Sequence, residues 1–359
     1  MSILGISAGY HDAAATVIDS QGNILFAGHS ERYSRQKNDA DIHIDLIAEL
    51  EQYNIDHVAY YETPWRKQLR QLYSGQGIEW HRLTTGQVLQ EQLQGFFRNV
   101  PSSQHSHHLS HAAAGFQTSP FLRATVVVID AIGEWDTITI WAAEYDDLGQ
   151  ATYKRLWGQK YPKSIGLFYS AITGRLGLRP LDEEYIVMGM AAYGEPKYAD
   201  TMRILANENL HVGVDHMFLP TAKDADIAAS AQLVAEEMIY SVMSRARAFG
   251  YSTNLVYQGG VALNCLANRN LGNYFENIWI MPSPGDAVAA LELLPRPMAE
   301  RLSLITHTWV MKSAANILQL PSSIAYYAIG SLELLVDGQS LVPVLWETEA
   351  YSQTLEDRI

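Results

Sequence analysis

The sequence predicts an α/β fold of two similar lobes, because one pattern of strands and turns occurs twice. In the first copy, residues 3–6 and 13–18 form predicted buried strands, and a polar turn leads into a third strand at residues 24–28. The second copy runs from Ala124 to Trp157 and repeats the order of strand, acidic turn with glycine, strand, turn and strand. Helical patterns follow both copies, as expected where helices cover a sheet.

Two such repeats are typical of ribonuclease H-like lobes that face each other across a cleft, as in the superfamily of actin, hexokinase and the sugar kinases. We assign the first lobe to residues 1–118 and the second to residues 119–287. The chain of 359 residues is long enough for both lobes. The alternative is a pair of unrelated β-meanders.

Composition limits the classes of partner. The formal net charge of -14 argues against nucleic acid as the main partner, since such proteins carry a basic face. We expect no membrane contact, because no stretch approaches the apolar length of a membrane helix and residues 1–16 lack the features of a secretory signal. Cys265 is the only cysteine, which excludes an internal disulfide and indicates a reducing cytoplasm. Composition leaves the oligomeric state open.

Three histidines lie in an alanine-rich run, residues 106–115, that is predicted to be helical. His107 and His111 are four residues apart and would project from one face of the helix, where both can reach a single divalent ion. His108 and His111, three residues apart, are the alternative pair. The competing interpretation is a solvated polar helix end without a metal.

Two further turns follow predicted strands, at the position where α/β sheets bind ligands. Residues 258–264 form a glycine-rich turn after the strand at 254–257, and the helix that follows favours anionic groups such as nucleotide phosphates. The strand at 277–281 runs into an acidic loop that reaches Asp286. An ordinary turn is the competing interpretation for each.

Several separated segments together resemble the O-carbamoyltransferases of nodulation-factor and antibiotic biosynthesis. They occur in the order and approximate spacing of that family, and the resemblance covers residues 3 to 287. A more distant likeness is to the universal threonylcarbamoyl-adenosine tRNA-modifying protein. The segments are residues 5–14, 31–39, 107–116, 130–137, 164–178, 184–196, 258–265 and 284–286.

The resemblance implies a divalent metal ion between the lobes, of the Fe²⁺ type, held by His107, His111, Asp130 and Asp286. Two neutral imidazoles and two carboxylates would give a neutral shell of nitrogen and oxygen ligands. Such a shell leaves coordination positions open for phosphate or substrate oxygens.

The resemblance also implies an ATP-dependent enzyme. In such enzymes, carbamoyl phosphate and ATP form carbamoyl-adenylate in a second, C-terminal domain, and the metal-binding lobes pass the carbamoyl group to a hydroxyl of a sugar-like or natural-product acceptor. The adenylate would lie near Gly259, Gly260 and Asn264. His11 and Asp12 would line the cleft as catalytic groups, where an imidazole or a carboxylate takes the proton of the acceptor hydroxyl.

The chain departs from the family in three places. Ile186 stands where a lysine is usual, and Asn38 replaces a common histidine. Residues 288–359 match nothing in the family, yet a shifted reading of the codons recovers its expected continuation at residues 307–313 and 339–356. We therefore expect 288–359 to be an aberrant, out-of-frame tail that is poorly ordered. Loss of the adenylating domain would then impair the transferase.

Two other functions remain open at this stage. An ATP phosphotransferase of the sugar-kinase type would bind Mg²⁺ through phosphates and would not need the histidine pair, so metal content separates it from a carbamoyltransferase. A non-catalytic nucleotide-binding or metal-binding remnant would retain ATP binding without turnover.

Overall fold

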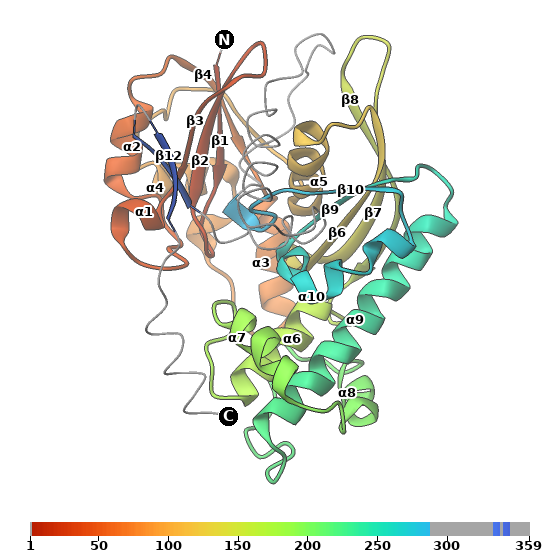
Figure 1. Cartoon of the computed structure of the whole chain (residues 1–359). Coiled ribbons are helices and arrows are strands. Elements are labelled where there is room, and N and C mark those ends of the chain that lie inside the picture. Colours follow the sequence, from red (N-terminus) through yellow and green to blue (C-terminus); the bar gives the residue numbers. More distant parts are fainter. Residues whose placement is uncertain (1, 288–332, 338–339, 345–359) are drawn as a thin grey trace.

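The computed structural model describes residues 2–287, 333–337 and 340–344, and its core is two five-stranded mixed sheets (Figure 1). In the first sheet, three antiparallel strands form one half, and two strands parallel to β1 form the other. The strand order is β3-β2-β1-β4-β5. The strands are β1 (Ser2–Ser7), β2 (Ala14–Asp19), β3 (Ile24–His29), β4 (Ile55–Tyr60) and β5 (Ser102–Gln104).

The second sheet has the same construction. Its first three strands are antiparallel, and the last two are parallel to β6, in the order β10-β9-β6-β7-β8. Counted from the first strand of each lobe, both sheets therefore share one strand order and one set of directions, which confirms the predicted pair of ribonuclease H-like lobes. The strands are β6 (Arg123–Gly133), β7 (Asp136–Tyr145), β8 (Ala151–Lys160), β9 (Asn254–Gln258) and β10 (Asn277–Ile280).

Helices of the first lobe cover its sheet with one apolar face. In α2, Leu46, Ile47 and Leu50 are fully buried, and this spacing places them on a single side of the helix. They pack with Leu4 and Val17 of the sheet into one core. The helices of this part are α1 (Glu31–Ser34), α2 (Ile44–Leu50), α3 (Pro64–Tyr73), η1 (Trp80–Arg82) and α4 (Thr85–Gln92).

Residues 239–246 and 262–275 of the second lobe pack with the second sheet, whereas the helices between residues 165 and 235 form a group below the sheets in Figure 1. The helices of this group pack around the buried side chains of Phe168, Ile172, Val187 and Ile227. No helix of the described residues combines the length and hydropathy that crossing a bilayer requires. The helices are α6 (Ile165–Arg175), α7 (Glu184–Met190), η2 (Ala191–Tyr193), α8 (Ala199–Leu205), α9 (Asp224–Ala248), η3 (Gly260–Leu263), α10 (Cys265–Asn268) and η4 (Leu271–Asn273).

Helix α5 (His107–Thr118) lies between the two sheets (Figure 1). Phe116 packs with Val126 and Val256 of the second sheet, whereas Ala114 packs with Ile18 of the first. The helix is buried along nearly its whole length, which explains its alanine-rich composition, since small side chains allow close approach on both sides. The boundary between residues 118 and 119 stays a prediction.

The predicted aberrant tail falls almost entirely outside the described residues. Within it, the structure describes the antiparallel pair β11 (Glu333–Asp337) and β12 (Ser340–Val344). The frame-shift hypothesis therefore has to be tested on the DNA sequence of the gene, because the described structure does not bear on it.

The turn after β9 depends on a glycine. Gly259 has φ of +90°, and a Cβ added there would lie 2.2 Å from the carbonyl oxygen of Ile129. Its N–H donates to the carbonyl of Pro284 at 2.9 Å, which ties the end of β9 to the acidic loop after β10. Only glycine combines this backbone conformation with such close packing.

We expect Gly259→Ala to lower the free energy of unfolding by roughly 2 kcal/mol or more, because it adds backbone strain and a steric clash. Gly272→Ala is the matched control, since an added Cβ there meets nothing within 4 Å. We expect it to change stability by less than about 0.5 kcal/mol. Urea denaturation measures both, and equal stability of the two variants would refute the prediction.

Candidate metal centre between the lobes

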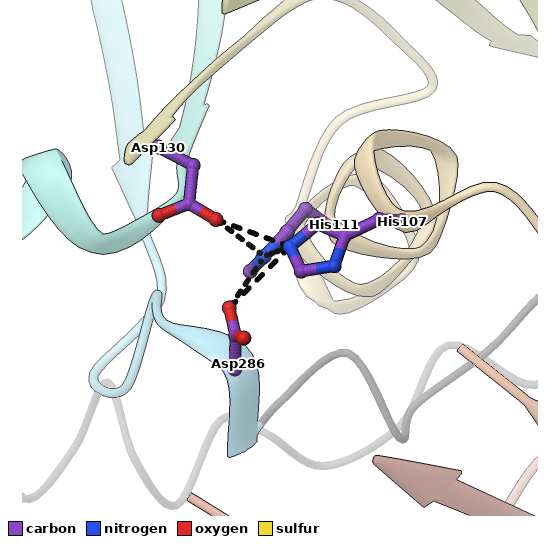
Figure 2. A group of neighbouring side chains, drawn as sticks. All are labelled: His107, His111, Asp130 and Asp286. Atoms are coloured by element: carbon purple, nitrogen blue, oxygen red, sulfur yellow. Dashed lines mark hydrogen bonds and ion pairs between the residues drawn. The ribbon is translucent and has the colours of Figure 1, made fainter. Parts of the chain in front are cut away.

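Four side chains converge at the centre of the molecule, and they are the four implied by the family resemblance (Figure 2). One ligand atom from each of His107, His111, Asp130 and Asp286 lies within 4.8 Å of all the others. The two histidines come from the first two turns of α5, four residues apart, so their rings project from one face. Asp130 belongs to β6, and Asp286 lies in the loop after β10.

The distances between these atoms suit a shared ion. Nε2 of His107 lies 3.1 Å from Nε2 of His111, 3.1 Å from Oδ2 of Asp130 and 3.5 Å from Oδ1 of Asp286. Nε2 of His111 lies 3.2 Å from Oδ1 of Asp286 and 3.7 Å from Oδ2 of Asp130. Ligands about 2.1 Å from an ion are separated by about 3.0 Å when cis-octahedral and by about 3.4 Å when tetrahedral. The residues therefore fit a divalent cation.

Backbone groups orient the carboxylate of Asp130. Its Oδ1 accepts from the N–H of Ala131 at 2.8 Å and from the N–H of Gly260 at 3.4 Å, which leaves Oδ2 directed at the histidines. The strand supports this geometry, because the register of β6 against β7 shifts between Ile129 and Gly133. The irregularity turns Asp130 towards α5.

Both aspartates of the cluster are ionised at neutral pH. Burial and the neighbouring Asp286 both favour the acid form of Asp130, but hydrogen bonding and charge from His107 and His111 outweigh them and lower its pKa to about 2. Burial also opposes ionisation of Asp286, yet His107 and His11 hold its pKa well below the usual range. Both groups are thus carboxylates, which is the form that a metal ion requires.

The structure decides between the two candidate histidine pairs. His108 is buried away from the cluster, and its Nδ1 lies 2.9 Å from the hydroxyl of Thr139 on β7. Burial, followed by the charge of His107, lowers the pKa of His108 to about 3, so it is a neutral core residue. The pair that converges on the aspartates is His107 and His111.

Sequence reasoning missed a carboxylate behind His107. Oε2 of Glu62 lies 3.9 Å from Nδ1 of His107, and its Oε1 is paired with Nζ of Lys67 at 2.7 Å. A carboxylate on the far nitrogen fixes the orientation of a metal-binding imidazole. Glu62 directly follows β4, so the rule that applied to Asp286, a carboxylate after a predicted strand, could have found it.

Glu134 joins the two lobes beside this cluster. Its Oε1 accepts from the N–H of Thr63 at 2.8 Å and from the N–H of His107 at 3.4 Å, and its Oε2 pairs with Arg66 at 3.1 Å. Gly133 allows the turn between β6 and β7 to approach α5 closely, since a Cβ added at this position would lie 2.4 Å from the ring of His107. The turn of the second lobe thereby caps two helix starts, those of α3 and α5.

Asp130 and Asp286 of the candidate metal centre lie on the wall of a cleft of about 810 Å³ that both lobes line. His11 and Asp12 lie there, in the turn between β1 and β2, with Nδ1 of His11 2.9 Å from Oδ2 of Asp12. Nε2 of His11 lies 3.8 Å from Oδ2 of Asp286. Nε2 of His29 lies 3.5 Å from Oδ1, the other carboxylate oxygen of Asp12. The structure thus brings both predicted catalytic residues to the metal cluster.

The predicted nucleotide residues divide into two groups. Gly260 and Asn264 line the cleft, whereas Gly259 packs against Ile129 and is not part of the lining. The side chain of Asn264 also caps α10 by accepting from the N–H of Ala267 at 3.1 Å, and it exchanges hydrogen bonds with Gln232. The side-chain amide of Asn264 therefore stabilises the local structure, and the residue also lines the cleft.

The two family departures have local explanations. Ile186 is buried in the helical core of the second lobe, so no cation is supplied there. Asn38 lies on the cleft and donates to the carbonyl of Leu181 in the other lobe at 3.3 Å. Its neighbour Lys37 also lines the cleft, with Nζ 3.8 Å from Asp182. Lys37 is a positive group available to a phosphate at this position.

The comparison with protein families agrees with this geometry. The family model described as carbamoyltransferase N-terminus matches residues 2–292. The chain belongs to this family. The match includes both lobes and all four residues of the candidate metal centre.

The curated relatives of this chain described below are bacterial and archaeal proteins. An uncharacterised protein of Synechocystis sp. is 33% identical over 349 residues, which cover 80% of this chain and 55% of the relative. The nodulation protein NolNO of Sinorhizobium fredii is 28% identical, covering 78% of this chain and 45% of its own length. An uncharacterised protein of Methanocaldococcus jannaschii is 23% identical, covering 80% and 61%. The chain spans about half the length of the curated relatives it matches.

Solved structures show more distant similarity. The activator of the 2-hydroxyisocaproyl-CoA dehydratase from Clostridium difficile, with bound ADPNP, is 12% identical with a TM-score of 0.45 and covers 82% of this chain and 93% of its own. Full-length HypF, in a phosphate- and nucleotide-bound form, is 12% identical with a TM-score of 0.45 and covers 82% of this chain and 54% of its own.

We expect the protein to bind one divalent ion and His111→Asn to weaken that binding by about 100-fold or more, because a direct ligand is lost. His216→Asn is the control, since the His216 side chain is 87% exposed and lies outside the cluster. Anaerobic titration with Fe²⁺, or with Co²⁺ followed by its visible absorption, measures the affinity. Equal affinity of the two variants would exclude the cluster as the binding site.

Proposed function

We propose that the protein is an ATP-dependent O-carbamoyltransferase that moves the carbamoyl group of carbamoyl-adenylate to a hydroxyl of a sugar-like or natural-product acceptor. The single observation that carries the proposal is the four-residue cluster, whose two aspartates lie on the wall of a cleft that both lobes of a carbamoyltransferase-family chain line. A buried set of two imidazoles and two carboxylates has no evident purpose in stability, because burying charges is costly unless they are compensated.

The two histidines and two aspartates would hold the ion, which we take to be Fe²⁺. A divalent ion there would supply Lewis-acid polarisation of phosphate or carbamoyl oxygens. The hydrogen bonds to Ala131 and Gly260 fix Asp130 in place before a substrate arrives. Preorganisation of this kind avoids a reorganisation cost during the reaction.

His11 and Asp12 would handle the acceptor proton. Asp12 binds Nδ1 of His11 and thereby directs the other nitrogen, Nε2, towards Asp286 and the cluster. Burial lowers the pKa of His11, but the charges of Asp286 and Asp12 outweigh it and raise this pKa to about 9. A divalent ion beside Asp286 would offset that charge and leave Nε2 unprotonated. As the hydroxyl oxygen bonds to the carbamoyl carbon, its proton passes to Nε2, and the bond between the carbamoyl carbon and the phosphate oxygen of the adenylate breaks to release AMP. Asp12 stabilises the imidazolium that results.

The adenylate would occupy the large cleft. Gly260 and Asn264 lie on one side of it, and Lys37 and Arg32 lie on the other. The cations suit the phosphate, and the backbone at Gly260 allows close approach. Carbamoyl phosphate and ATP would be the sources of the donor.

We also propose that residues from about 288 onward are translated out of frame. In that case the chain transfers a carbamoyl group that is supplied as carbamoyl-adenylate, and it is impaired in forming that donor. The support is the shifted-frame match at residues 307–313 and 339–356.

We expect the full chain with Fe²⁺ to release AMP from supplied carbamoyl-adenylate in the presence of a hydroxyl acceptor, with carbamoylated product detected by mass spectrometry. Asp286→Asn should slow the release by about 100-fold or more, because it removes a charged ligand. Asp147→Asn, at an exposed position of the β7–β8 turn, should leave the rate unchanged.

Two outcomes would contradict the proposed function. Formation of ADP and a phosphorylated acceptor from ATP would indicate a phosphotransferase. Binding of ATP and metal without transfer from carbamoyl-adenylate would indicate a non-catalytic protein.

We expect the DNA of the gene to encode, in a shifted frame after codon 287, the continuation that the family predicts. Resequencing of the gene from genomic DNA decides this. A single uninterrupted frame with no family-like continuation in the other frames would refute the hypothesis.

A further inference from the structure

A second cavity, of about 400 Å³, lies on another side of the metal cluster. It is lined by the residues that follow β4 and by α3 from the first lobe, and by α6 and the segment around His211 from the second. Its volume lies within the range of small-molecule sites, about 300 to 1,000 Å³. Neither the nucleotide residues Gly260 and Asn264 nor the cations Arg32 and Lys37 line this cavity.

The two cavities meet at the cluster. His11, Asp130 and Asp286 line both of them, so the groups proposed for metal binding and proton transfer separate the two spaces. A transferase needs its donor and its acceptor to reach one reacting carbon from different directions. If the adenylate occupies the larger cleft, the smaller cavity is the space left for the acceptor.

Arg70 is the unusual residue of the smaller cavity. It is 5% exposed, and arginine is seldom buried without an anionic partner. Its hydrogen-bond partners among the described residues are the carbonyl of Glu134 at 3.3 Å and the side-chain oxygen of Gln76 at 2.9 Å, both neutral. No carboxylate of the described residues forms an ion pair with it.

The other charges that surround the cavity are compensated. Lys67 pairs with Glu62 at 2.7 Å, and Arg66 pairs with Glu134 at 3.1 Å. Burial, followed by the charge of Arg70, lowers the pKa of His211, so this imidazole adds no positive charge at neutral pH. Asp130 and Asp286 face the histidines of the cluster. Among the residues that the structure describes, the guanidinium of Arg70 is therefore the positive charge of this cavity that has no paired carboxylate.

We infer that the second cavity binds the acceptor and that Arg70 recognises a carboxylate on it, so that the preferred substrate is a hydroxyl-bearing acid such as a uronic acid. This inference rests on the proposed carbamoyl transfer. A guanidinium presents N–H groups in a planar fork that matches a carboxylate, and burial strengthens the resulting hydrogen bonds. Tyr10 lies on the same wall with its ring 48% exposed, and it can stack against a sugar ring.

The test compares sugars that differ only at C6. We expect the full chain with Fe²⁺ to bind D-glucuronate at least about tenfold more tightly than D-glucose in isothermal titration calorimetry. D-Glucose 6-phosphate is a third ligand, and it shows whether the site takes a carboxylate or any oxyanion. Stronger binding of D-glucuronate than of both other sugars supports the carboxylate, and equal or stronger binding of the phosphate overturns it.

Arg70→Gln should abolish the preference for D-glucuronate over D-glucose, whereas Arg70→Lys should keep part of it. Arg247→Gln, at an exposed position of α9, is the control and should keep all of it. Metal content and the thermal unfolding midpoint confirm that each variant is folded. If Arg70→Gln does not fold, the comparison of sugars with the unchanged protein still decides the question.

The inference is overturned if D-glucuronate binds no better than D-glucose, or if Arg70→Gln keeps the preference. This failure is distinct from failure of the proposed function. Carbamoyl transfer to D-glucose and D-glucuronate at equal efficiency would refute acid recognition alone. Binding of D-glucuronate through Arg70, without transfer to any hydroxyl, would refute carbamoyl transfer alone.

Discussion

The structure depends on charge compensation among four buried side chains at the junction of its lobes. Two carboxylates there are largely buried, and each alone, without a compensating charge, would be strongly destabilising. His107 compensates them, because the charge of Asp286 and the hydrogen bond that His107 donates to Asp130 overcome its burial and raise its pKa well above the ordinary value. A divalent cation would compensate them more completely. The elements around the cluster are arranged to keep these groups together.

The arrangement is shared between both lobes. Helix α5 contributes both imidazoles and is packed between the sheets, while β6 and the loop after β10 contribute the carboxylates from the second lobe. Glu62 reaches His107 from the first lobe, and Glu134 reaches it from the second. Since the same residues separate two cavities, the contacts that hold the lobes together also define where two different ligands can meet.

Much of this architecture could be predicted from the sequence, because it is encoded locally. The repeated strand pattern gave the two lobes, and the spacing of His107 and His111 gave their common helical face. The choice of Asp130 and Asp286 needed the family resemblance, since an acidic residue after a strand is usually only a turn residue. Lys67 and Arg70 could not be assigned, because a single charged residue has no periodic signal and its role depends on which distant groups compensate it.

The full burial of His111 has a consequence for the order in which the metal ion and the substrates would bind. Its side chain has no exposed surface and lines neither cavity, so an ion that enters from either one would reach Asp130 and Asp286, which line both, before it reaches Nε2 of His111. Both cavities are spaces that substrates would later fill. If the protein binds an ion and its substrates as proposed, loading of the ion would precede occupancy by donor and acceptor, and a fully occupied protein would exchange its ion with solvent very slowly. The metal found in the purified protein would then record which ion was available when the chain folded.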